Sequence, residues 1–91
     1  MSEYRAAPQV SWAVEAGGVL LIDRATGAAV ALGYPQAAVW DFLTRGESEE
    51  RICAMLCAIA SLQPEAARTL LLETAAALRE AGFLEPRPAG G

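Results

Sequence analysis

The chain of 91 residues is long enough for one small domain, and a chain of this size buries roughly 60–65% of its extended surface on folding. A hydrophobic content of 54% and a charged content of 20% predict a globular fold and exclude a disordered chain. The net charge of −4 argues against a nucleic-acid partner, because phosphate contacts require a positive surface. Histidine is absent, which removes the commonest general base and metal ligand.

The sequence contains no signal for a membrane or a secretory pathway. No apolar run reaches the roughly 18 residues that a spanning helix needs, and the first residues include Glu3 and Arg5 where a signal peptide would be apolar. Cys53 and Cys57 are four residues apart in a predicted helix, which is an awkward geometry for a disulfide. No histidine or further cysteine completes a zinc site around them. We therefore expect a cytoplasmic protein with two reduced thiols and neither a metal nor another cofactor; a redox or metal role for the thiols is the alternative.

The first half of the chain carries the patterns of strands. Residues 10–14 place apolar side chains at every second position, which predicts a half-buried strand. Residues 19–22 form an apolar run between turn signals and are expected to be the central strand. Asp23 suits the turn that follows, because its side chain can accept hydrogen bonds from the nearby backbone. Residues 28–32 predict a third strand, and the short turns imply an antiparallel meander.

The second half of the chain changes to helical periodicity. Residues 36–44 repeat apolar side chains at helical spacing and predict a first helix. Ser48 is the expected N-cap of a second helix, and Pro64 is expected to open a third. Gly82 suits the left-handed residue that ends the third helix, with Phe83 folding back onto it.

The predicted order is three strands followed by three helices. A three-stranded sheet does not bury its apolar face alone, so three amphipathic helices packed on it predict one small α+β core. We expect this domain to cover residues 10–85, between a flexible N-terminus at residues 1–9 and a disordered tail at residues 86–91.

Over residues 10–85 the sequence resembles the PqqD-like family, which contains the recognition elements of ribosomally made, post-translationally modified peptides. The resemblance rests on an ordered set of residues, with no single diagnostic motif. The set consists of Leu20-Leu21-Ile22-Asp23, Ala31-Leu32, Ala37-Ala38-Val39-Trp40, Leu43, Gly46, Ile52, Leu56, Leu71, Leu78 and Gly82-Phe83-Leu84. Three positions depart from the family pattern: Gly33 replaces a usual Asn, Leu70 a frequent Asp, and Ala75 a common Leu. Because two of these positions are on or beside the presumed binding groove, partner specificity is expected to differ from that of better-known members.

The resemblance implies a winged-helix-like, non-catalytic chaperone that binds the leader region of a precursor peptide. In the family the leader adds as an extra strand to the free edge of the third strand, in the cleft beside the third helix. The domain then presents the precursor to a modifying enzyme, expected here to be encoded nearby. The peptide-binding residues that we expect on this sequence are Ala28, Ala29, Val30, Ala31, Leu32, Arg68, Leu70, Leu71 and Thr74.

The third predicted strand supports this interpretation without the family. Its side chains are small, and it lacks the Lys or Pro that blunts an edge strand against unwanted pairing. The consecutive leucines of the third predicted helix place Leu71 in the core. If the cleft implied by the resemblance is present, Leu70 and Thr74 are expected beside it and Arg68 and Arg79 opposite acidic leader residues.

Three other functions compete with peptide recognition. A nucleic-acid-binding winged helix is disfavoured because the third predicted helix is net negative. An enzyme is disfavoured because a chain without His or Lys offers no nucleophile–base pair. The principal alternative is an oligomerisation or protein-interaction subunit of a biosynthetic enzyme complex that does not bind peptide directly. A homodimer is compatible with either function.

Overall fold

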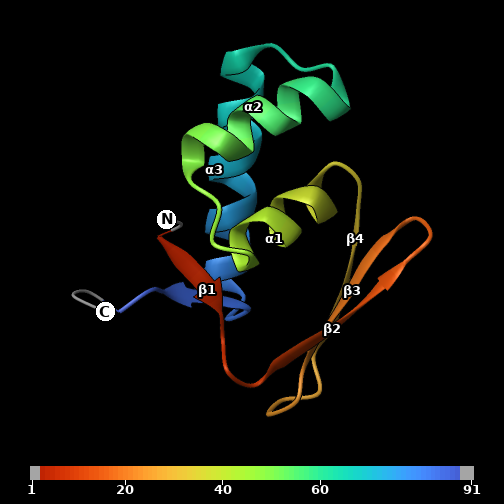
Figure 1. The fold of residues 1–91 in the computed structure, drawn as a ribbon. Helices are drawn as coiled ribbons and strands as arrows, with labels where there is room; N and C mark the ends of the chain where they lie inside the picture. Colours follow the sequence, from red (N-terminus) through yellow and green to blue (C-terminus); the bar gives the residue numbers. More distant parts are fainter. Residues whose placement is uncertain (1–2, 89–91) are drawn as a thin grey trace.

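The computed structural model describes residues 3–88 and confirms the predicted α+β fold class. A three-stranded antiparallel sheet has the strand order β2-β3-β4, and the three helices follow it in the chain. Figure 1 shows the sheet on one side of the molecule and the helices on the other. The bounds are β2 Val10–Glu15, β3 Gly18–Asp23, β4 Ala29–Gly33, α1 Gln36–Thr44, α2 Glu49–Ala60 and α3 Pro64–Glu80.

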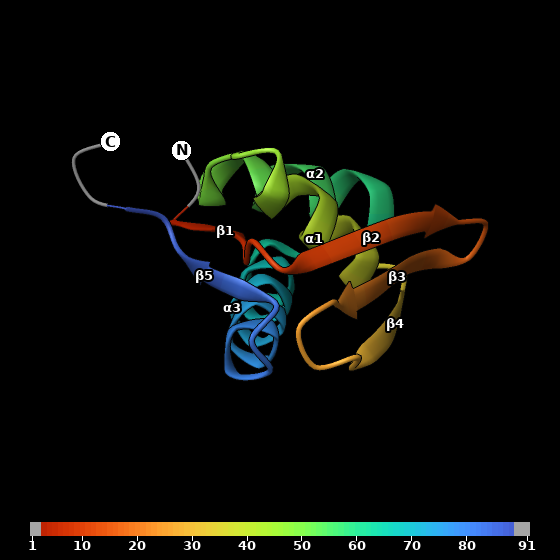
Figure 2. The ribbon, with the colours of Figure 1, turned by 90° about the horizontal axis from the view of Figure 1, so that it is seen from below.

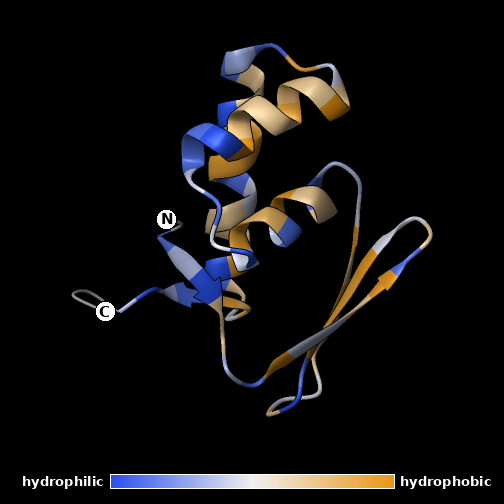
Figure 3. Cartoon of the chain, viewed as in Figure 1, coloured by the Kyte–Doolittle hydropathy of each residue, from blue (hydrophilic) through white to orange (hydrophobic). Residues whose placement is uncertain are grey.

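A second sheet joins the two ends of the described chain. Strand β1 (Tyr4–Ala6) pairs antiparallel with β5 (Leu84–Pro86), and the two lie side by side in Figures 1 and 2. An ion pair of 3.1 Å joins Arg5 Nη2 to Glu85 Oε2 across this sheet. Each strand has three residues, too few to show an alternating pattern, and Figure 3 shows both as largely hydrophilic.

Two of the expectations for the chain ends therefore need correction. The flexible N-terminus predicted at residues 1–9 is replaced over residues 4–6 by strand β1. The disordered tail predicted at residues 86–91 begins in the structure with the last residue of β5, and the amide of Arg87 donates a 2.8 Å hydrogen bond to the carbonyl oxygen of Glu3. The remaining residues of the two predicted segments, 1–2 and 89–91, lie outside the described residues.

The turn between β3 and β4 is built on the buried carboxylate of Asp23. Its Oδ1 accepts hydrogen bonds from the backbone amides of Ala25, at 2.9 Å, and Thr26, at 3.3 Å, as predicted. Its Oδ2 accepts from Nε2 of Gln9 at 3.4 Å, and the same amide group donates to the carbonyl oxygen of Gly82 at 3.4 Å. Gln9 thereby links the hairpin to the chain segment that ends α3.

The helix ends follow local rules that the sequence predicted. The side chain of Ser48 caps α2 by accepting a hydrogen bond from a backbone amide in the first turn. Gly82 has a φ of +86° beyond the end of α3. Its amide donates to the carbonyl oxygen of Arg79, and the amide of Phe83 donates to that of Leu78, at 3.0 and 2.9 Å. This is the Schellman arrangement, which turns Phe83 back onto the helix and into the core.

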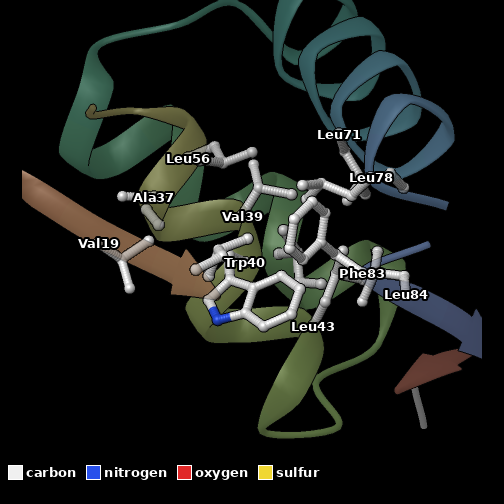
Figure 4. Close-up of a cluster of buried hydrophobic side chains, with 14 of the residues drawn as sticks. Val19, Ala37, Val39, Trp40, Leu43, Leu56, Leu71, Leu78, Phe83 and Leu84 are labelled. Atoms are coloured by element: carbon white, nitrogen blue, oxygen red, sulfur yellow. The ribbon is translucent and has the colours of Figure 1, made fainter. Parts of the chain in front are cut away.

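Helix α1 is the centre of the core. It packs against β3 and β4 on one side and against α2 and α3 on the other. Trp40 of this helix is only 1% exposed, and Figure 4 shows its indole among Val19, Val39 and Phe83. Trp12 of β2 meets it edge to face, with ring centroids 5.2 Å apart and an interplanar angle of 85°.

The close approach of β3 to β4 at Gly18 gives a first test of the fold. A Cβ at Gly18 would lie 1.9 Å from the carbonyl oxygen of Leu32, so Gly18→Ala must displace β4. We expect this variant to lose about 2 kcal/mol or more of unfolding free energy. Gly17→Ala is the matched control, because a Cβ there meets no atom within 4 Å. Urea denaturation followed by tryptophan fluorescence compares them, and equal stabilities would contradict this packing.

Candidate functional site

Strand β4 is an edge strand with a free side. Its only strand neighbour among the described residues is β3, in a register that places Val30 opposite Leu21 and Leu32 opposite Val19. At the start of the ladder, the amide of Asp23 donates a 2.8 Å hydrogen bond to the carbonyl oxygen of Ala28.

This hydrogen bond determines which backbone groups of β4 face outward. In an antiparallel ladder, hydrogen-bonded and non-hydrogen-bonded pairs alternate along the strand. The N–H and C=O groups of Val30 and Leu32 therefore point toward β3. Those of Ala29, Ala31 and Gly33 point toward the free edge, where they can pair with an added strand.

The side chains of β4 alternate in the complementary way. Val30 and Leu32 are half-buried on the face that turns toward the helices, whereas Ala29, Ala31 and Gly33 are exposed. Figure 3 shows hydrophobic residues along both β3 and β4. One strand thus offers an apolar face and an open backbone edge side by side.

A groove of about 370 Å³ separates β4 from α3. The two elements do not pack closely on each other in the described structure, because α1 lies against both. The groove is lined by Val30 and Leu32 of β4, by Leu70, Glu73, Thr74, Ala77 and Leu78 of α3, and by Gln36, Ala81 and Phe83 nearby. Apart from Gln36, Glu73 and Thr74, these side chains are apolar, so the groove suits an apolar side chain.

The structure brings together most of the residues predicted to bind peptide. Val30, Leu32, Leu70 and Thr74 line the groove. The backbones of Ala29 and Ala31 form its open edge. Ala28 precedes β4, and its carbonyl oxygen is occupied by the bond to Asp23. That these residues bind a peptide stays a prediction.

On α3, two of the predicted residues lie outside the groove. Leu71 is 2% exposed and belongs to the core, as the sequence also predicted. Arg68 lies on another side of α3, where it lines a cavity together with Cys53 and Glu49. The reason is helical geometry, because two residues along a helix rotate a side chain by roughly 200° away from Leu70.

Several groove residues were missed by the sequence analysis. Glu73, Ala77 and Leu78 continue the i, i+3, i+4 series that begins at Leu70, so helical spacing contained the signal for them. Gln36 and Phe83 come from other segments, and only the tertiary structure places them here.

A second cavity, of about 260 Å³, opens beside the tip of the β2–β3 hairpin. Its lining includes Trp12, Val14 and Tyr34, which are 42%, 76% and 59% exposed, respectively. Trp40 forms part of its wall, and the buried Nε1 of this indole has no hydrogen-bond partner in the described structure. The Asp41–Arg45 ion pair also lines this cavity, which therefore combines exposed apolar side chains with charged ones and has one unused donor close by.

Residues 3–88 hold no group of three or more His, Cys, Asp or Glu side chains placed to bind a metal ion. None of the helices described is long and apolar enough to cross a bilayer.

Two solved structures share this fold. One, described as lasso peptide synthetase B1 complexed with the leader peptide, has a TM-score of 0.85 and 24% sequence identity, over 93% of this chain and 100% of that chain. The other, TbiB1 in complex with the TbiA(beta) leader peptide, has a TM-score of 0.84 and 24% identity, over 92% and 98% of the respective chains. Likenesses at this level of identity establish the fold. No family model matches the chain, and no curated protein matches it as a relative.

The environment of Cys53 leads to a testable chemical property. Both cysteines are free, and burial raises the pKa of the Cys53 thiol, an effect that the nearby Arg68 guanidinium opposes. A raised pKa leaves less thiolate at a given pH, so Cys53 should react with iodoacetamide more slowly at pH 8 than an unstructured cysteine peptide. Measured in a Cys57→Ser background, the rate should fall further in Arg68→Gln. If Cys53 reacts with iodoacetamide as fast as the unstructured cysteine peptide, the raised pKa expected from burial is contradicted.

Proposed function

We propose that this protein is a PqqD-like leader-peptide recognition element. It binds the leader region of a ribosomal precursor peptide as an added strand between β4 and α3 and presents it to a separate modifying enzyme, without catalysing a reaction itself. The observation that carries the proposal is an open strand edge that borders an apolar groove. The two solved structures that share the fold are both complexes with a leader peptide, which supports the same role.

Main-chain pairing supplies the register of the bound leader. The outward N–H and C=O groups of Ala29, Ala31 and Gly33 bond to the peptide backbone, as in other complexes formed by strand addition. Each such hydrogen bond contributes only about 1 kcal/mol net, because the peptide gives up bonds to water. These bonds are also independent of the leader sequence.

Apolar side chains of the leader supply the specificity. Alternate residues of an added strand point to the same face, so every second leader side chain enters the groove between Leu32 and Leu70. Full burial of one Leu-sized side chain is worth about 1.5–3 kcal/mol, more than any single main-chain bond. One or two such anchors therefore decide which leader binds.

A pair of proline variants tests strand addition. Ala31→Pro removes an outward donor and leaves the ladder to β3 intact, so the folded protein should lose at least tenfold in leader affinity. Val30→Pro removes a donor that faces β3 and should instead destabilise the sheet. Fluorescence polarisation with the labelled leader encoded beside this gene measures affinity, and thermal denaturation measures stability. Unchanged leader binding by a folded Ala31→Pro variant would rule out pairing at this edge.

A pair of leucine variants tests the groove. Leu70→Glu places a charge where an apolar leader side chain is expected to pack, and affinity should fall at least tenfold, or about 1.4 kcal/mol. Leu72→Glu makes the same change at a 46% exposed residue outside the groove, and affinity should change less than twofold. If both variants bind the leader equally well, the anchor lies elsewhere.

A second candidate function is an oligomerisation or interaction subunit of an enzyme complex. It is favoured by the exposed Trp12, Val14 and Tyr34 around the hairpin cavity, which neither the groove nor β4 uses. Sedimentation velocity over a hundredfold range of protein concentration separates the two functions. Self-association without leader binding would favour the interaction subunit, whereas a monomer that binds the leader would favour recognition.

A further inference from the structure

The charges of α3 are segregated about the groove. Successive residues of a helix are 100° apart, so Glu73 and Glu80 lie within about 80° of Leu70, on the groove side. By the same geometry Arg68 and Arg79 lie about 160–180° from Leu70, on the opposite side. The rim of the groove on α3 is therefore acidic, although the helix also carries two arginines.

The carboxylate of Glu73 is exposed and lines the groove, and it joins no ion pair within residues 3–88. Ion pairs in the described part of the chain join Arg5 to Glu85, Arg45 to Asp41 and Arg51 to Glu47. Glu80 is also exposed and belongs to none of them. Two carboxylates beside an apolar groove are thus available to a ligand.

Ala77 lies between these carboxylates on the helix surface. It follows Glu73 by four residues and precedes Glu80 by three, and residues at these spacings are neighbours. Ala77 is exposed and lines the groove, and its methyl group leaves room above it. The apolar stem of a Lys or Arg side chain fits over such a position while its charged head stays in water.

We propose that the leader bound by this protein carries a Lys or Arg on the side of the added strand that faces α3, with its charge between Glu73 and Glu80. The cation is an even number of residues from an apolar side chain that packs near Leu70, because side chains on one face of a strand repeat every second residue. This inference rests on the proposed function and specifies the chemistry of the peptide. It replaces the expectation that acidic leader residues meet Arg68 and Arg79.

Reversing the charge of Glu73 tests the proposal. Glu73→Lys replaces attraction by repulsion, and at 50 mM salt the affinity for the labelled leader encoded beside this gene should fall about five- to tenfold. The difference should shrink to less than twofold at 0.5 M salt, because the screening length falls to a few ångströms. Glu65→Lys is the matched control: it makes the same net-charge change on α3, at a residue outside the groove.

Charge reversal in the peptide identifies the partner of Glu73. Each Lys or Arg of the leader is changed to Glu in turn, and one such peptide should bind Glu73→Lys at least threefold better than it binds the wild-type protein. Equal losses in Glu73→Lys and Glu65→Lys, with no peptide rescued, would overturn the cation site while leader recognition stands. Failure of the unaltered leader to bind the wild-type protein would overturn the proposed function itself, and the cation site with it.

Discussion

The groove depends on the burial of α1 between the sheet and the other helices. Its buried side chains contact β3 and β4 on one side and α2 and α3 on the other. Truncating a buried tryptophan such as Trp40 costs about 3–5 kcal/mol, so this spacing between layers is strongly held. Since α1 keeps α3 away from β4, Val30 and Leu32 remain half-buried and the strand keeps its free edge.

The polar contacts at one end of the groove hold its two walls together. Gln9 bonds both to Asp23, in the turn before β4, and to Gly82, just beyond α3. The wall formed by the strand and the wall formed by the helix are thus tied at the end where α3 stops. A site whose walls are already placed loses less conformational entropy when a peptide binds.

An open edge strand with an apolar face is normally a liability, because it invites pairing with any other chain. In the proposed complex the leader satisfies both features at once: its backbone pairs with β4 and its alternate side chains fill the groove. The acidic rim at Glu73 and Glu80 adds a long-range preference for a basic segment. Main-chain pairing and apolar packing in the groove act at short range, whereas the charges of the rim act at longer range. Together these three interactions select a peptide sequence more narrowly than any one of them does.

The sequence alone determined the features that depend on short-range periodicity. It predicted three strands, three helices, and the ends of the helices at Ser48, Pro64 and Gly82. The expectation that Leu70 and Thr74 lie beside the third strand came instead from the family resemblance. Helical spacing also places Arg68 on the side of the helix opposite Leu70 and Glu73 on the same side as Leu70, so the sequence contains both of these placements.

Only the tertiary structure decided the pairing of β1 with β5, the contributions of Gln36 and Phe83 to the groove, and the gap that α1 maintains between β4 and α3. The physical reason is that periodicity shows which face of an element is apolar, whereas the element that covers this face depends on contacts between residues far apart in the chain.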